Sequence, residues 1–362
     1  IKADGSLGRE GGLSKDRPVL IDHFLESATE VDVDALRDKT GVTHIGGIMQ
    51  HVEEAGIHSG DSACAIPAEF LSGKVTRKLI EITEKLAKNL EVIGLLNVQF
   101  AIKNEEVYVI EANPRASRTV PFVAKAIGVP LIKIATRIML GESLKNLSKV
   151  YKFKIDDHNR IQNVHDSKLV AVKQPVFPFS RFADADSILG PEMRSTGEVM
   201  GVSDNFATSF AKALVAGGDD IPHAGTVFLS VANRDKEALL PIARKFIELG
   251  FTIAATGGTS KYLKEQFVQV AIEVAKVTAD GETHDGTNAA NLINSGLIKL
   301  VINTPMGRGA KADGDYIRIA TRKNNVPIAT TIFAAEAIVD SIENADEKFS
   351  VRSLQSWHGL NK

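Results

Sequence analysis

Residues 95–113 read LLNVQFAIKNEEVYVIEAN, which is two strand-like runs joined by a short polar turn. Side chains alternate between the two faces of a strand. Asn97 and Gln99 therefore share one face of the first run, and Glu111 and Asn113 share one face of the second. The opposite faces are apolar, which is typical of adjacent strands that cover a core on one side.

The pairing register of these runs follows from the same alternation. If a three-residue turn at 104–106 sets Lys103 opposite Val107, then Gln99 lies opposite Glu111 and the two asparagines also face each other. A shift by one residue would mix polar and apolar side chains on both faces. We therefore predict a hairpin with one polar face and one core face.

The polar face has the chemistry of a divalent-cation site. Carboxylate and amide oxygens are the ligands that Mg²⁺ and Mn²⁺ accept, with phosphates and water completing the shell. Gln99, Glu111 and Asn113 are the predicted metal ligands. Arg115 and Arg118 follow directly and are predicted to clamp phosphates. The alternative is a solvent-facing hairpin with ordinary surface arginines.

The chain around this hairpin alternates between strand and helix patterns. Strand-like runs are expected at 18–22 and 30–35, and apolar residues at helical spacing predict an amphipathic helix over 74–90. A helical stretch is expected over 120–140. Residues 148–168 are polar and weakly patterned, which indicates an irregular excursion.

From Gly225 onward the pattern becomes a regular strand–helix alternation. This alternation predicts a compact α/β unit with a mostly parallel sheet. The strands are expected at 226–231, 251–255, 268–277, 298–303 and 327–330, and the main helices at 236–249 and 333–342. Gly250 follows the first of these helices, where a left-handed cap residue is favoured.

The composition excludes several classes of protein. The chain has 362 residues, enough for two or three domains, and its 43 basic and 45 acidic residues nearly balance. This balance gives no electrostatic case for binding nucleic acid or a membrane. No apolar run is long enough to span a bilayer, and no signal peptide is expected. The single cysteine, Cys64, fits a small buried core residue and a reducing cytoplasm.

Three segments carry a resemblance to a known family. They read DHFLESATE (22–30), EEAGIHSGDS (53–62) and IEANPRASR (110–118), and GPEMRSTGEV (190–199) supports them. They closely resemble the second ATP-grasp half of carbamoyl-phosphate synthetase large subunits. The resemblance runs from about Pro18 to the end of the chain.

The resemblance implies roles for individual residues. His23 and Leu25 would contact adenine, Glu30 would accept hydrogen bonds from the ribose, and the loop residues Gly56, Ile57, His58 and Ser59 would line the nucleotide. Gln99 and Glu111 would contact ATP as well as metal, with Asn113 completing a site for two ions. Arg115, with Arg118, would stabilise charge on the transferred phosphoryl group. The implied reaction is the phosphorylation of carbamate by ATP.

An ATP-grasp site also needs an earlier lobe with a glycine-rich phosphate loop. Nothing upstream of Asp22 supplies that lobe, and residues 1–14 do not resemble the family. The sequence therefore predicts half an active site from a longer gene product. The alternative, from another functional class, is a non-catalytic module that senses nucleotides.

The second half of the chain has its own candidate site. The turn at 256–259, Thr-Gly-Gly-Thr, closes a strand and opens a helix, where backbone amides and hydroxyls can bind an anion. Other polar residues follow strand ends, where ligands of open α/β sheets bind.

The region resembles the methylglyoxal-synthase-like allosteric domain of the synthetase, which implies a phosphorylated effector such as UMP or IMP. The implied contacts are Lys236, Thr256, Thr259, Lys276, Asn303, Thr304 and Arg308. A methylglyoxal synthase is disfavoured, because its aspartate-bearing catalytic segment has no match.

Together these observations predict a mixed α/β and α+β chain. Residues 1–222 are expected to form the carboxy-terminal lobe of an ATP-grasp domain, and residues 223–362 a Rossmann-like, methylglyoxal-synthase-like domain. The resemblance implies a separate glutaminase small subunit as partner, since the chain has no thiol nucleophile of its own. It leaves a higher oligomer open.

Overall fold

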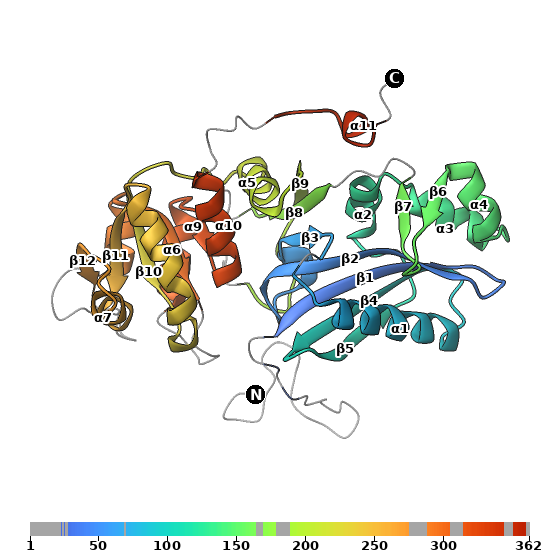
Figure 1. Ribbon diagram of the computed structural model, residues 1–362, viewed down its shortest axis with the longest axis horizontal. Helices are drawn as coiled ribbons and strands as arrows, with labels where there is room; N and C mark the ends of the chain where they lie inside the picture. Colours follow the sequence, from blue (N-terminus) through green and yellow to red (C-terminus); the bar gives the residue numbers. More distant parts are fainter. Residues whose placement is uncertain are drawn as a thin grey trace.

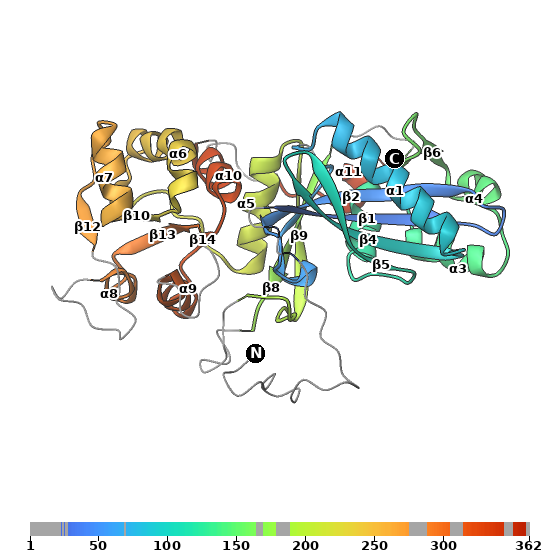
Figure 2. The same cartoon turned by 90° about the horizontal axis from the view of Figure 1, so that it is seen from below.

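The computed structural model describes residues 23, 25, 28–68, 70–163, 169–178, 189–274, 288–304, 314–343 and 350–359. Within them lie a seven-stranded sheet, a five-stranded sheet and a two-stranded hairpin (Figures 1 and 2). The strand order is β5-β4-β1-β2-β3-β8-β9 in the first sheet and β12-β11-β10-β13-β14 in the second.

The seven-stranded sheet is antiparallel throughout and carries helices on both faces. Helix α1 packs on one face; α2, α3 and α4 pack on the other (Figure 1). The strands are β1 (Thr29–Arg37), β2 (Thr43–Glu54), β3 (Cys64–Ile66), β4 (Gly94–Lys103), β5 (Glu106–Asn113), β8 (Val170–Val176) and β9 (Gly197–Ser203). The helices are α1 (Gly73–Asn89), α2 (Val120–Ile127), α3 (Leu131–Met139) and α4 (Leu144–Tyr151).

Helix α1 confirms the amphipathic pattern expected over 74–90. The hydroxyl of Ser72 caps its first turn by accepting a hydrogen bond from the amide of Val75. Leu79 is fully buried against the apolar face of the sheet, next to Val98 and Phe100 of β4. The other face of β4 is thereby left for the polar residues that form the site.

The five-stranded sheet is parallel, as the strand–helix alternation predicts. Its strands are β10 (Thr226–Ser230), β11 (Thr252–Thr256), β12 (Ile272–Val274), β13 (Ile298–Asn303) and β14 (Ile328–Ala329). Its helices are α6 (Lys236–Glu248), α7 (Gly257–Glu265), α8 (Ala289–Asn294), α9 (Gly314–Lys323) and α10 (Ile332–Glu343), with a short turn η3 (Asn233–Asp235). Residues of β10 are buried on both faces, because helices cover both sides of the sheet.

Two of the regions that differ from the sequence expectation lie between residues 120 and 168. The helical stretch expected over 120–140 is two helices, because Gly128 takes a left-handed φ of 67° at the end of α2 and Pro130 caps α3. Residues 148–168, expected to be irregular, contain the end of α4 and the hairpin β6 (Phe153–Ile155)–β7 (Ile161–Asn163). The strand expected at 18–22 and the end of the one expected at 268–277 lie outside the described residues.

Helix α5 (Phe206–Gly217) joins the two sheets. It packs on β8 and β9 of the first sheet and on α10 beside the second. The rings of Phe206 and Phe333 stack with centroids 4.6 Å apart. A single apolar cluster therefore runs from one unit into the other. A domain boundary at 222/223 remains a prediction.

A carboxy-terminal segment returns from the parallel sheet to the antiparallel one. It contains α11 (Leu354–Trp357) and ends at the buried His358 (Figure 1). The Nε2 atom of His358 lies 2.7 Å from the carbonyl oxygen of Lys125, at the end of α2. We call residues 350–359 the terminal strap.

Candidate functional site

The β4–β5 hairpin brings the predicted metal ligands together. Gln99 lies opposite Glu111, and Asn97 lies opposite Asn113, as predicted. The turn itself was predicted wrongly, because Lys103 pairs with Glu106 rather than with Val107.

The turn is two residues long, and a bulge corrects the register. Asn104 and Glu105 both have positive φ, 51° and 62°, as a tight primed turn requires. The pairing then shifts between Gln99 and Phe100, which leaves Ile110 as an extra residue on β5. Without this extra residue, a two-residue turn would place Ile110 opposite Gln99.

A pocket of about 300 Å³ opens beside this hairpin. Seven of the predicted site residues line it, namely His58, Ser59, Gln99, Glu111, Asn113, Arg115 and Arg118. Residues that the sequence reading did not single out for a role complete the wall, among them Asp32, Asn97, Lys173, Ser195 and Glu198. The side-chain alternation of the hairpin therefore identified the β4–β5 side of the pocket, and the resemblance identified His58 and Ser59. Neither singled out Lys173 or Glu198.

The amide groups in the pocket present their oxygens for coordination. The Nε2 atom of Gln99 donates to the hydroxyl of Ser59 at 3.0 Å. The Nδ2 atom of Asn113 donates to Oε1 of Glu111 at 2.7 Å. Because both amide nitrogens are engaged as donors, both amide oxygens remain for a cation. This donor set of three oxygens fits a hard divalent ion such as Mg²⁺ or Mn²⁺.

The two arginines sit at the mouth of the pocket on the segment after β5. Both side chains are exposed, and neither forms an ion pair with a carboxylate in the described part of the chain. Arg118 contacts the sulfur of Met193, and Arg115 contacts the carbonyl oxygen of Ala116. Two cations without anionic partners beside a pocket are suited to an anionic ligand.

The loop between β2 and β3 forms the opposite wall. The backbone amide of His58 donates to the carbonyl oxygen of Gly190. The buried carboxylate of Asp61 accepts the amides of Arg194 and Ser195 at 2.7 and 2.8 Å. Residues 190–195 thus hold the 58–61 loop in place, and the hydroxyl of Ser195 also donates to the carbonyl oxygen of Gly60 at 2.9 Å. The buried Lys173 donates to the carbonyl oxygen of Ser59 at 2.9 Å.

A buried cluster of two carboxylates and a histidine adjoins the pocket through Asp32, which lines it. The carboxylates of Glu30 and Asp32 lie 3.9 and 3.7 Å from the two ring nitrogens of His51. Burial raises the pKa of Glu30. The ligand atoms of these three residues lie within 4.8 Å of one another, which is close enough to share a cation. The alternation of β1 gave no indication that its acidic side chains would be fully buried.

The other residues predicted to contact ATP do not line this pocket. His23 is exposed and Leu25 is half-buried, and neither lines the pocket. Glu30 accepts a long hydrogen bond, 3.4 Å, from the amide of Gly56. Gly56 and Ile57 also lie outside the residues that line the pocket.

Those predicted effector residues that the structure describes converge at the carboxyl ends of β10, β11 and β13. The Thr259 hydroxyl accepts the amide of Val231 at 3.2 Å and lies 3.4 Å from the Thr256 hydroxyl. Thr304 accepts the amide of Ala232 at 2.9 Å. Asn303 donates to the carbonyl oxygen of Ser230 at 3.1 Å.

Lys236 begins α6 beside this cluster of hydroxyl groups. Its ammonium lies over the ring of Tyr262, 6.0 Å from the centre of the ring. Arg318, which the sequence reading missed, donates to Asn303 at 3.0 Å. Lys276 and Arg308, also predicted to contact the effector, lie outside the described residues.

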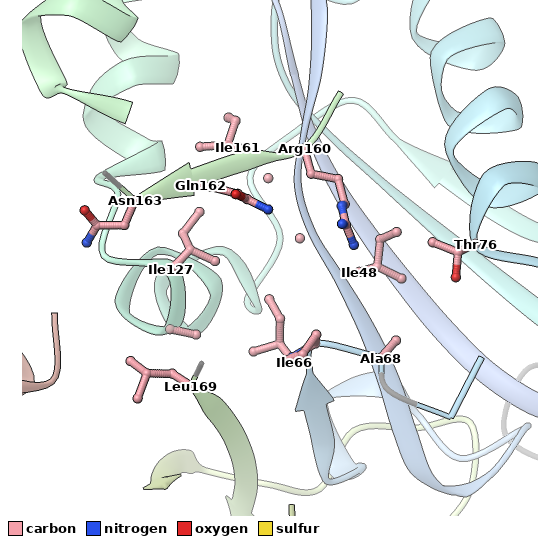
Figure 3. Close-up of a pocket in the computed structure, with 14 residues that line it drawn as sticks. Ile48, Ile66, Ala68, Thr76, Ile127, Arg160, Ile161, Gln162, Asn163 and Leu169 are labelled. Carbon is pink, nitrogen blue, oxygen red and sulfur yellow. The ribbon is translucent and has the colours of Figure 1, made fainter. Parts of the chain in front are cut away.

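A larger cavity of about 390 Å³ lies between β2, β7 and α2 (Figure 3). Ile48, Ile66 and Ile127 supply apolar walls, and Arg160 extends over them from the position just before β7. The guanidinium of Arg160 is paired with Asp156 at 2.8 Å. None of the predicted site residues lines this cavity, so it is separate from the predicted metal-binding face.

Two family models match the chain. The ATP-binding domain of the carbamoyl-phosphate synthase L chain matches residues 10–147, and the MGS-like domain matches residues 238–330. The carbamoyl phosphate synthase large chain, C-terminal section, of Aquifex aeolicus is 47% identical over 96% of this chain and 65% of its own length. The chain belongs to the carbamoyl phosphate synthase large-chain family.

The chain corresponds to the carboxy-terminal part of these large chains. The large chain of Synechocystis sp. is 46% identical over 96% of this chain, which spans 31% of that relative. The match begins at residue 10, upstream of Pro18, so the expectation that residues 1–14 lie outside the family was wrong in part.

Among solved structures, a biotin carboxylase from Campylobacter jejuni covers 53% of the chain at 15% identity with a TM-score of 0.40, and this chain covers 46% of it. Pyruvate carboxylase from Rhizobium etli covers 53% at 16% identity with a TM-score of 0.42, and this chain covers 19% of it.

Two simpler observations accompany the family assignment. Cys64 is buried on β3, as expected for a core cysteine. No helix in the described parts of the chain combines the length and hydropathy needed to cross a bilayer.

Proposed function

We propose that this chain supplies the metal-binding half of the site at which a carbamoyl phosphate synthase phosphorylates carbamate with ATP. The observation that carries the proposal is the pocket in which Gln99, Glu111 and Asn113 present oxygen atoms beside Arg115 and Arg118. Family membership supports it, because the relatives are named as large chains of this synthase.

The proposed step is a direct phosphoryl transfer. A carbamate oxygen attacks the γ-phosphorus of ATP, the bond from that phosphorus to the β,γ-bridging oxygen breaks, and ADP leaves with the electron pair. Two bound Mg²⁺ or Mn²⁺ ions would neutralise part of the charge on the phosphates. Arg115 and Arg118 would bind the equatorial phosphoryl oxygens, so catalysis rests on positioning and charge stabilisation.

The nucleotide would occupy the space between the hairpin and the 56–61 loop. His58 and Ser59 line the pocket from that loop. Glu30 would accept hydrogen bonds from the ribose, and His23 and Leu25 would close over the adenine. The phosphate-binding lobe that completes an ATP-grasp site would come from outside this chain, which spans about a third of the large chains it matches.

The parallel sheet is proposed to bind a phosphorylated effector such as UMP or IMP. Lys236, Thr256, Thr259, Asn303 and Thr304 would hold its phosphate and ribose, together with Lys276 and Arg308. Ammonia is proposed to come from a separate glutaminase small subunit, because the lone thiol is buried in a strand of the core. Rapid glutamine hydrolysis by the purified large chain alone would contradict this partner assignment.

The reverse reaction tests the proposed chemistry at this site alone. The complete enzyme, given MgADP and carbamoyl phosphate, should form ATP and carbamate without glutamine or bicarbonate. Arg115→Ala should reduce this rate at least a hundredfold. If ATP formation persisted at the wild-type rate in that variant, the pocket would not be the transfer site.

A further inference from the structure

Asp34 is a fully buried carboxylate in the middle of β1. It lies opposite Asn97 on β4, and its Oδ1 atom accepts the Nδ2 of Asn97 at 3.0 Å. Oδ1 also accepts the hydroxyl of Ser117 at 3.0 Å, and Oδ2 accepts the hydroxyl of Thr119 at 3.0 Å. The two hydroxyls lie 2.7 Å from each other.

These three donors come from the two elements that carry the proposed site. Asn97 lies two residues before Gln99 on the same face of β4 and pairs with Asn113. Ser117 and Thr119 flank Arg118 on either side. One carboxylate therefore joins the strand that bears the metal ligands to the segment that bears the arginines.

The arginine segment has few other side-chain anchors. Residues 114–119 form no regular helix or strand, and Arg115 and Arg118 are exposed. Their guanidinium groups pair with no carboxylate of the described chain, so the backbone beneath them sets where they lie. The hydrogen bonds from Ser117 and Thr119 to Asp34 attach that backbone to the sheet.

Burying a carboxylate costs free energy unless it is fully hydrogen-bonded, and an apolar residue would fill a β-sheet core without that cost. Asp34 accepts three side-chain donors from two different segments, which no apolar residue could do. We propose that Asp34 is a positioning residue that holds the 115–119 segment so that Arg115 and Arg118 face the metal-binding side of β4 and β5. This inference rests on the proposed phosphoryl transfer at that site.

Asp38 offers a matched control. It lies just beyond the end of the same strand, is fully buried, and accepts a comparable set of hydrogen bonds. Its donors are the amide and hydroxyl of Thr40 at 2.9 and 2.6 Å, the amide of Val42 at 3.3 Å and the amide of Leu144 at 2.7 Å. These contacts shape a turn and the start of α4, away from the pocket. Asp38→Asn should therefore lower stability without changing catalysis.

The test compares Asp34→Asn, Thr119→Val, their double variant and Asp38→Asn in the complete enzyme. ATP formation from MgADP and carbamoyl phosphate gives kcat and KM, and electron paramagnetic resonance gives the affinity for Mn²⁺. For Asp34→Asn we expect kcat to fall at least thirtyfold, with KM for MgADP and the Kd for Mn²⁺ within threefold of wild type. Thr119→Val should lose about tenfold.

The Asp34→Asn/Thr119→Val double variant distinguishes a positioning role of Asp34 from a general loss of stability. If the carboxylate and the hydroxyl act through one hydrogen bond, the double variant should be no slower than Asp34→Asn. Losses that multiply, or a folded Asp34→Asn enzyme with kcat within twofold of wild type, would overturn the inference. An equal loss of kcat in Asp38→Asn would overturn it as well.

Different experimental results would contradict the proposed function itself. Failure of the wild-type enzyme to bind Mn²⁺, or full activity of an Arg115→Ala variant, would remove the transfer site itself. Should those two results hold while Asp34→Asn stays fast, only the positioning role of Asp34 is wrong.

Discussion

Gln99 on β4 pairs with Glu111 on β5, although the turn between these strands is one residue shorter than the alternation of side chains predicts. Ile110 bulges out of β5 and restores the pairing. The bulge lies directly beside the proposed metal ligands, a place where such irregularities often aim a side chain. The polar face of the hairpin thus depends both on the alternation of side chains along the two strands and on the extra residue Ile110 in β5.

The role of Glu111 is tested by Glu111→Gln. A neutral amide would replace the one anionic ligand of the hairpin while keeping its shape. We expect the rate of carbamoyl phosphate formation to fall at least a hundredfold, about 3 kcal/mol of transition-state stabilisation. The affinity for Mn²⁺ should fall in parallel.

Glu106→Gln is the matched control, since Glu106 lies at the other end of β5 and contacts Lys78 on the surface. This variant should keep the wild-type rate. A Glu111→Gln enzyme within a factor of two of wild type would exclude a metal role for this carboxylate.

The sequence predicted the floor of the site because period-two alternation is a local property. Gln99 and Glu111 follow from two short runs of residues, and the parallel sheet follows from the strand–helix rhythm after Gly225. Lys173 could not be predicted in the same way. It reaches the pocket from β8, and its partner Ser59 is more than a hundred residues away in the sequence.

The turn shows a second limit. Asn104 and Glu105 are both in the left-handed region, and glutamate is not a residue that favours it. A three-residue turn was therefore the natural prediction for Asn-Glu-Glu. Pairing along the rest of the hairpin outweighs this local preference.

The effector site makes a prediction that can be tested by calorimetry. A phosphate beside Lys236 would accept a charge-assisted hydrogen bond worth roughly 1.5–3 kcal/mol. UMP or IMP should bind at one site per chain, and Lys236→Ala should weaken the binding at least tenfold. Uridine should bind far more weakly than UMP.

Lys261→Ala, on the exposed side of α7, is the control and should leave the affinity unchanged. Equal binding of uridine and UMP would mean that these residues do not recognise a phosphate.

Asp219 predicts a pH dependence of stability. Burial raises the pKa of this carboxyl to about 6, although Arg322 nearby lowers it. Since this value exceeds that of an unfolded chain, the folded state binds the proton more tightly, and the unfolding free energy falls as pH rises from about 4 through 6. At pH 8, Asp219→Asn should raise the unfolding free energy by about 1–3 kcal/mol. At pH 4, it should have little effect.

Denaturant unfolding at both pH values measures this difference, and Asp220→Asn at the exposed neighbouring position serves as the control. A stabilisation of equal size at pH 4 and pH 8 would show that ionisation of Asp219 is not its cause.

The terminal strap makes the last prediction, and Trp357 reports on it directly because it is the one tryptophan of the chain. The charged groups of Lys212 on α5 and of Arg352 lie over the ring of Trp357, 5.5 and 4.9 Å from its centre. His358, next in the chain, is buried and bonded to the carbonyl oxygen of Lys125. Removing that ring in His358→Ala should release the strap and cost about 1–3 kcal/mol of stability.

Trp357 should then become more accessible to acrylamide quenching under native conditions, before any global unfolding. Gln355→Ala, at an exposed position of α11, should leave the quenching unchanged. Lys125 lies near the end of α2, and Thr119 immediately precedes its first residue, so release of the strap should free the end of α2 that lies farther from the arginine segment. If quenching in His358→Ala matched wild type, the histidine would not be what holds the strap in place.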